Sequence, residues 1–291
     1  MKMLQRCLLL PVLIVPLFIV SESLFAQAAE GDIVRVETRD RSVLIGTLIR
    51  ETEERVVIRV DGVGEVAIER ENIRSIQVIP PDRIRNGEYW FENPQSTRYF
   101  FAPNALPLRR GKGYYQNVWI FFNNVNYGAT DHFSIGAGTV PIFLFGTLSI
   151  PIWVLPKFSV PLGDDVYLGA GGLLGGVIGE DSQGFGLLYS TFTYGNRDRN
   201  LTAGIGYGYA GREWSDTPLV NLSGIYRTGR TAYLLGEIYF APGVEGSGFA
   251  IGGMRWSPER FAIDFGLARP LTDAGGIIGV PWLGISIPFG N

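Results

Sequence analysis

The chain has 291 residues, and only 18% of them are charged, a share below the roughly 25% typical of soluble proteins. With a formal net charge of -3 and no basic run, the sequence offers no footprint for nucleic acid, and we expect no nucleic-acid partner. A single histidine and a single cysteine cannot form the usual zinc sites, so we expect neither a metal nor another cofactor.

Residues 1–29 have the pattern of a secretory signal peptide. An apolar run at residues 8–20 follows two basic residues and precedes small residues at positions 26–29, where we predict cleavage. The run contains two prolines and is too short for a membrane span. Cys7 would leave with the peptide, so we expect no disulfide or thiol nucleophile in the mature chain.

Residues 30–80 are predicted to form a small periplasmic module. Short runs rich in Val and Ile, separated by turn residues, predict five strands at residues 33–38, 43–51, 55–60, 65–69 and 73–78. With Gly46 in a bent second strand and Glu71-Asn72-Ile73 leading into the last, the layout resembles the Sm-like and SH3-like small barrels. The Sm-like resemblance implies RNA binding. Secretion, and the absence of a basic stripe with stacking aromatics, favour docking of an envelope protein or peptide at a strand edge instead.

Residues 81–96 are predicted to be a linker. Pro80 and Pro81 end the module because proline cannot continue a paired strand. The three neighbouring rings of Tyr89, Trp90 and Phe91 are interpreted as an aromatic anchor at a membrane face.

Residues 97–291 are predicted to form a transmembrane antiparallel β-barrel. In residues 201–209 the odd positions are mostly large and apolar while the even positions are Thr or Gly, a period of two that indicates a strand. An apolar outer face and a small or polar inner face are typical of a membrane barrel, whereas a soluble sandwich or lipocalin-like barrel would have polar outer faces. About twelve strands are expected, at residues 97–107, 113–127, 132–140, 151–160, 165–177, 184–194, 201–211, 218–227, 231–240, 248–256, 261–270 and 279–289.

The connections between these strands alternate between short and mostly longer ones, with residues 109–112 assigned to the longer set. Because short turns face the periplasm in outer-membrane barrels, the module, the linker and the C-terminus are predicted to be periplasmic in a Gram-negative bacterium. The last strand ends at Phe289, which resembles the terminal aromatic signal for barrel assembly, although Gly290 and Asn291 follow it. Outer-membrane lipids and the barrel assembly machinery are the expected partners.

Several segments resemble an uncharacterised family of outer-membrane proteins of Bacteroidota-type bacteria. The resemblance lies in Asn-Pro-Gln-Ser-Thr-Arg-Tyr-Phe-Phe-Ala-Pro at residues 93–103, and in residues 113–117, 124–128, 195–198 and 281–285. It spans most of residues 93–289 and implies an outer-membrane barrel. It carries no activity, so it transfers no catalytic residue.

The predicted inner face holds ionisable groups, which are costly at membrane depth unless they meet water or a partner. The alternation turns Lys157, Glu237 and Asp264 inward. They are interpreted either as a selectivity patch or ligand-pocket floor, or as groups that pair with one another and plug a narrow lumen. Four aromatic residues are predicted beside them: Tyr233, Tyr239, Trp153 and Trp282.

One pair of residues, His132 and Ser134, has a spacing of enzymatic interest. A His-x-Ser pair on a barrel strand resembles the lipid A deacylases, in which histidine activates serine. The pair shares a face with Gly136 and Gly138, lacks an identifiable orienting carboxylate, and follows a predicted periplasmic turn, whereas lipid A lies in the other leaflet. We therefore expect a non-enzymatic narrow pore or envelope-anchored binding platform, with a lipid-modifying enzyme as the alternative.

Overall fold

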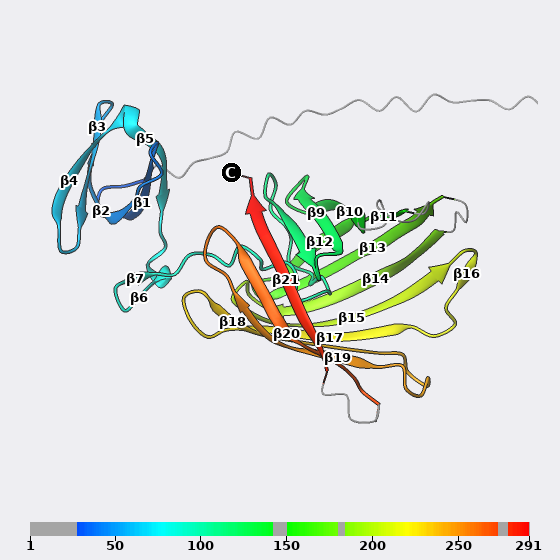
Figure 1. Ribbon diagram of the computed structural model, residues 1–291. Coiled ribbons are helices and arrows are strands. Elements are labelled where there is room, and N and C mark those ends of the chain that lie inside the picture. Colours follow the sequence, from blue (N-terminus) through cyan, green and yellow to red (C-terminus); the bar gives the residue numbers. More distant parts are fainter. Residues whose placement is uncertain (1–27, 142–149, 180–183, 273–278, 291) are drawn as a thin grey trace, which may run out of the picture. The chain divides into compact units, whose positions relative to one another are not determined.

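The structure is a computed structural model that describes residues 28–141, 150–179, 184–272 and 279–290. The chain divides into two compact units, Met1–Tyr89 and Trp90–Asn291. Apart from two single-turn 3-10 helices, the regular elements of the described residues are all strands (Figure 1). The predicted signal peptide lies outside the described residues, apart from its last two positions. No helix in the described part of the chain is long and apolar enough to span a membrane.

The first unit is a five-stranded antiparallel sheet in the order β4-β3-β2-β1-β5. Its elements are β1 (Ile33–Thr38), β2 (Val43–Glu51), β3 (Arg55–Val60), β4 (Gly64–Glu69), η1 (Arg70–Asn72) and β5 (Ile73–Val78), followed by η2 (Pro81–Arg83), β6 (Ile84–Arg85) and β7 (Glu88–Tyr89). The five predicted strands are confirmed almost to the residue. In β1, β2 and β3 buried positions alternate with more exposed ones, and this period of two sets their register.

One face of this sheet packs into a small apolar core made of Val34, Val36, Leu48, Val56, Ile58 and Ile68. Gly46 allows the bend in β2, because a Cβ there would run into the main-chain carbonyl of Arg59. In the β1–β2 turn, hydrogen bonds from the Thr38 hydroxyl and from Ser42 to the exposed Asp40 carboxylate lower the pKa of Asp40.

The second unit is a closed antiparallel barrel (Figure 1). Within the described residues its wall has twelve positions, each filled by one strand or by two consecutive strand segments, and we call each position a stave. The strands are β8 (Gly113–Val118), β9 (Phe122–Gly128), β10 (Phe133–Thr139), β11 (Ile150–Val154), β12 (Lys157–Gly163), β13 (Val166–Ile178), β14 (Gly184–Gly195), β15 (Arg199–Ala210), β17 (Leu219–Arg227), β18 (Ala232–Phe240), β19 (Phe249–Trp256), β20 (Ala262–Pro270) and β21 (Val280–Phe289). β16 (Glu213–Trp214) only extends the β15 edge. β21 pairs with β8 and β9 pairs with β10, which closes the ring.

β11 and β12 together make one stave. Both pair with β10 and β13, and the register is the same on the two sides of the interruption. Leu155 between them exchanges two main-chain hydrogen bonds with Gly136. The interruption falls at Leu155 and Pro156, where proline has no N–H to donate. The single predicted strand at residues 151–160 therefore corresponds to this one stave, interrupted at Leu155 and Pro156.

Two predicted strands are wrong, and the errors cancel in the count. Residues 97–107 are not a stave, and residues 113–127 form two staves, β8 and β9, joined by a tight turn. Trp119 and Ile120 occupy that turn with positive φ values of 52° and 68°. Such a conformation is rare for bulky or β-branched residues, so the sequence there carries no turn signal.

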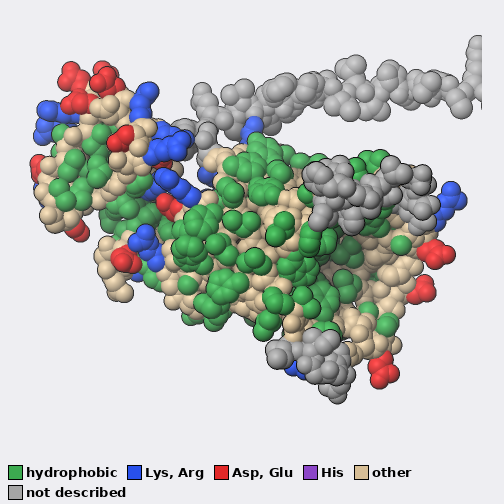
Figure 2. All heavy atoms as spheres, viewed as in Figure 1, with side chains coloured by type: hydrophobic (Ala, Val, Ile, Leu, Met, Phe, Trp, Pro, Cys, Tyr) green, Lys and Arg blue, Asp and Glu red, His purple; other side chains and the backbone are tan. Residues whose placement is uncertain are grey.

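The barrel exterior is apolar. Large exposed side chains cover it, including Phe192, Leu201, Ile205 and Leu283, and charged side chains gather at its margins (Figure 2). Near the short turns the outward positions are largely aromatic, as in the interfacial girdles of membrane barrels: Tyr127, Phe133, Phe158, Tyr194, Tyr226, Trp256 and Phe289. This surface suits lipid and not water, so the barrel is of the transmembrane type.

Both ends of the barrel unit lie at the edge that carries the short turns. β8 starts there and β21 ends there, since Gly113 pairs with Phe289. The assignment of residues 109–112 to a longer outer loop is wrong: the Gly111 N–H donates to the Gly128 carbonyl at 2.9 Å, beside a short turn. The turn at residues 119–121 takes its place at the opposite edge.

Candidate functional site: a plugged lumen

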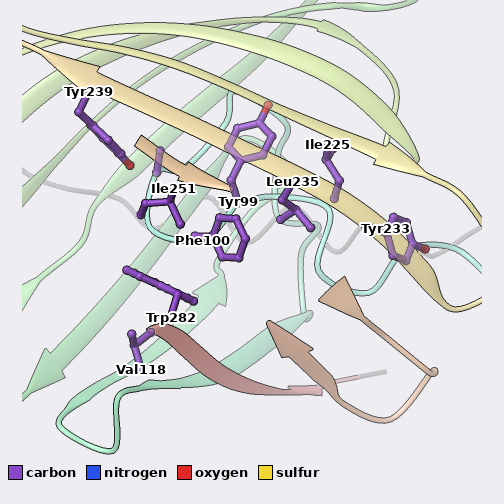
Figure 3. Packing of buried hydrophobic residues seen from close by; sticks show 10 residues of the cluster. Tyr99, Phe100, Val118, Ile225, Tyr233, Leu235, Tyr239, Ile251 and Trp282 are labelled. Atoms are coloured by element: carbon purple, nitrogen blue, oxygen red, sulfur yellow. The ribbon is translucent and has the colours of Figure 1, made fainter. Parts of the chain in front are cut away.

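Residues 91–108 enter the lumen from the short-turn edge and return to it. An isolated bridge between Arg98 and Pro103 folds them into a hairpin, which we call the plug. Gln95, Tyr99, Phe100 and Asn104 are all 0% exposed. Figure 3 shows Tyr99 and Phe100 packed against inward residues of the barrel wall. The segment predicted partly as linker and partly as a strand is thus the inner filling of the barrel.

The barrel holds the plug first through a buried ionic triad. Asp264 on β20 accepts from the plug's Arg98 Nη1 at 2.8 Å and from Arg255 Nε on β19 at 2.5 Å. Arg98 also donates to the Ser286 hydroxyl, and Arg255 donates to the plug carbonyls of Gln95 and Tyr99 at 2.7 Å. All three charged side chains are at most 3% exposed. Charges so deeply buried stay ionised only when they are paired and hydrogen-bonded.

Glu237 on β18 binds the tip of the plug. Its Oε1 accepts the main-chain N–H groups of Phe101 at 2.9 Å and Ala102 at 3.1 Å, while its Oε2 accepts the Tyr239 hydroxyl at 2.7 Å. The carboxylate therefore supplies acceptors to a turn whose N–H groups would otherwise be buried without partners.

Lys157 on β12 binds the returning arm. Its Nζ donates to the carbonyls of Asn104 and Leu106, each at 2.8 Å, and the side chain is buried. Nearby, the Ala105 N–H donates to Thr193 at 2.8 Å, and the Tyr99 hydroxyl contacts Asn200 and Thr202 at 2.5 Å. The plug is thus bound to several staves around the lumen.

A second ionic group lies where the plug enters. Arg227 pairs with Asp198 at 3.0 Å and donates to the Phe91 carbonyl at 2.9 Å, and its guanidinium lies 5.0 Å from the centre of the Trp90 ring. Phe91 is buried. These two rings pack on Arg227. Because Phe91 is buried it cannot serve as the predicted anchor at a membrane face, which stays a prediction for Tyr89 and Trp90.

The remaining lumen is a cavity of about 1100 Å³ between the plug and the opposite edge. Its wall is mostly apolar, with Leu173, Phe185 and Leu187 on β13 and β14. A row of ring contacts runs along another side, through Phe100, Trp282, Trp119, Phe122 and Trp153, with centroid spacings of 4.8 to 6.4 Å. The expectation of a small or polar inner face therefore fits the plugged half and not this one.

All seven predicted lumen residues point inward, but the three ionisable ones are not arranged as the pairing interpretation requires. Lys157, Glu237 and Asp264 do not form ion pairs with one another in the described structure; each binds the plug. Trp153 and Trp282 line the cavity together with Tyr239, and Tyr233 lies under Arg227 at 5.3 Å. Arg98 and Arg255 were not among the predicted lumen residues. Arg98 lies in the plug segment that was predicted to be a strand, whereas the place of Arg255 on the inner face of the predicted strand 248–256 was a usable signal.

His132 and Ser134 are not hydrogen-bonded to each other in the described residues. His132 is exposed, with Nδ1 at 3.1 Å from the Ser159 carbonyl and its ring 6.4 Å from that of the outward Phe158. Ser134 is buried and lines the cavity. In the described parts of the chain, no three His, Cys, Asp or Glu side chains gather in a group that could hold a metal ion.

No protein-family model and no curated protein matches this chain. Among solved structures, it is similar to the NanC porin at 9% identity, over 61% of this chain and 96% of that one, with a TM-score of 0.37. It is also similar to OmpT of Vibrio cholerae at 12% identity, over 89% of this chain and 94% of that one, with a TM-score of 0.32. The in-vitro folded trimer form of OmpT gives 12% identity, 88% and 96% coverage, and a TM-score of 0.31.

Proposed function

We propose that this protein is an outer-membrane barrel that forms a passage shut at rest by its own plug, and that it is not an enzyme. The apolar exterior supports a membrane location, and the short turns then face the periplasm, as in other outer-membrane barrels. On this proposal residues 30–80 form a periplasmic module of the Sm-like or SH3-like kind. The chain would belong with the uncharacterised Bacteroidota-type barrels that its sequence resembles.

The observation that carries the proposal is the chemistry of the plug's contacts. A permanently closed lumen could be filled with apolar side chains, which pack without desolvation cost. Here the plug is bound through carboxylate, ammonium and guanidinium groups to main-chain atoms and to Arg98. Water entering the lumen can replace hydrogen bonds of this kind one by one, so such a plug can be displaced without unfolding the barrel.

The test is conductance in planar bilayers. We expect the purified wild-type chain to be silent, and a variant with residues 93–107 replaced by a short Gly/Ser linker to give steady ion conductance. Deleting residues 32–79 is the control, because it removes the module and leaves the plug; it should stay silent. Equal, steady conductance in all three proteins would show that the plug closes nothing, and silence in all three would show that no passage exists.

A second candidate is an envelope-anchored binding platform, and the strand order of the module favours it. β4 and β5 are the outer strands of its sheet, so each presents an edge that an extended peptide can pair with. Cross-linking followed by purification should then recover an envelope protein with the full chain and lose it when residues 32–79 are deleted. Recovery of the same partner by the deleted chain would place its binding site elsewhere.

A further inference from the structure

The wall of the cavity above the plug is chemically unlike a water channel. Inward side chains from five staves line it with hydrocarbon: Leu173, Phe185, Leu187, Leu219, Ile251 and Val280. The Phe101 side chain at the plug tip is 58% exposed toward this space. Apolar surface of this extent is costly when it faces only water, and barrels that pass small polar solutes have polar interiors. The wall therefore suits a hydrocarbon chain.

The floor of the same cavity carries a buried cation without a carboxylate. Lys157 lines the cavity, is 7% exposed, and forms no ion pair with any acidic side chain in the described residues. Its two partners are neutral carbonyls, and an ammonium has three protons to donate. A buried charge in this state is strongly favoured by an anionic partner.

Two hydroxyl groups lie on the same side of the wall as this cation, one on the neighbouring β10 and one on β14, two staves away. Ser134 on β10 is the register partner of Lys157 and is also buried on the cavity wall. On the other side Lys157 pairs with Gly171, and the Tyr189 hydroxyl lies over that glycine, at 2.6 Å from where a Cβ would be. The missing side chain of Gly171 thus leaves room for the Tyr189 phenol over the register partner of Lys157. Thr191, two residues further along β14 toward the short-turn edge, has a buried hydroxyl with no hydrogen-bond partner among the described residues.

We propose that the cavity binds a long-chain carboxylic acid, with its carboxylate on Lys157, Ser134 and Tyr189 and its hydrocarbon chain along the apolar wall. The volume, about 1100 Å³, slightly exceeds the roughly 300–1,000 Å³ of typical small-molecule sites, so the cavity has room for a long chain. This ligand rests on the proposed function, because it is what the proposed passage would admit. Because the carboxylate competes with two plug carbonyls for the same ammonium, binding would also weaken the hold of Lys157 on the plug.

The test compares two probes that differ only in the head group. The full chain, in phosphatidylcholine nanodiscs, is titrated with oleate and with oleyl alcohol, and bound ligand is counted by native mass spectrometry. We expect saturable binding of oleate, about tenfold tighter than that of the alcohol, because a charge-assisted hydrogen bond is replaced by a neutral one. Lys157→Met should abolish this preference. If Lys157→Met only loosened the plug, the ratio of the oleate affinity to the oleyl alcohol affinity would not change.

A matched pair of variants tests the position of the chain. Gly204 faces the cavity and a Cβ there would meet its neighbours at ordinary distances of 3.4 Å or more, whereas Ala203 on the same strand faces outward. Gly204→Leu should weaken oleate binding about tenfold or more, and Ala203→Leu should leave it unchanged. Heat-modifiable migration on gels confirms that each variant is folded. Three results would each overturn the proposed ligand: equal binding of both probes, equal effects of both leucine substitutions, or no saturable binding. These results do not depend on the conductance test of the passage.

Discussion

The buried triad at Asp264 gives the sharpest prediction about what holds the plug. Asp264→Asn keeps the shape of the side chain and removes the one negative charge between Arg98 and Arg255, which are 3% and 0% exposed. The amide must also turn a donor toward one of two guanidinium groups that have no acceptor. Breaking a buried ion pair from one side costs about 3–5 kcal/mol because the remaining charge stays buried and uncompensated. We expect the free energy of unfolding of the barrel to fall by about 3–5 kcal/mol.

Urea unfolding in lipid vesicles, followed by tryptophan fluorescence, measures this loss, and bilayer recording of the same variant should show openings. Asp164→Asn in the exposed β12–β13 turn is the control and should change stability by less than about 0.5 kcal/mol. Adding Arg98→Met to Asp264→Asn should restore part of the loss, because it removes one of the two stranded cations. If the two substitutions were additive to within about 0.5 kcal/mol, the plug would not be held by this pair.

Three further outcomes follow from single contacts. Glu237→Ala leaves the two main-chain N–H groups at the plug tip without an acceptor, at about 1–3 kcal/mol each, and should raise the open probability in bilayers; an unchanged record would contradict this role. Gly46→Ala should destabilise the N-terminal sheet by about 1–3 kcal/mol, seen as faster hydrogen exchange in β1–β3 of the full chain, with barrel amides as the internal control. Phe289→Ala should lower the fraction of heat-modifiable barrel in cells, since its ring covers Gly113 at the β21–β8 closure; Leu271→Ala, in a loop at the other edge, should not.

The barrel could be read from the sequence because its information is local. Alternation with a period of two in each strand assigns an inner and an outer face without knowledge of neighbouring strands, and nine of the twelve predicted segments correspond to single uninterrupted strands. Where the local signal failed, the prediction failed with it. The turn at Trp119 and Ile120 has no turn residues, and residues 97–107 were predicted to be a strand although they form part of the plug, which is buried in the lumen.

The sequence by itself determined the module's five strands and the apolar exterior of the barrel, since each depends on residues a few positions apart. It predicts the signal peptide at the N-terminus. It also indicated that Lys157, Glu237 and Asp264 face inward. Their partners were decided only by the tertiary structure, because Arg98 and Asp264 are 166 positions apart and Phe101 and Glu237 are 136 apart. Pairs of adjacent leucines, such as Leu173 with Leu174 and Leu187 with Leu188, make both faces apolar. Only closure of the ring shows that the inner leucines of such pairs enclose a cavity above a polar plug.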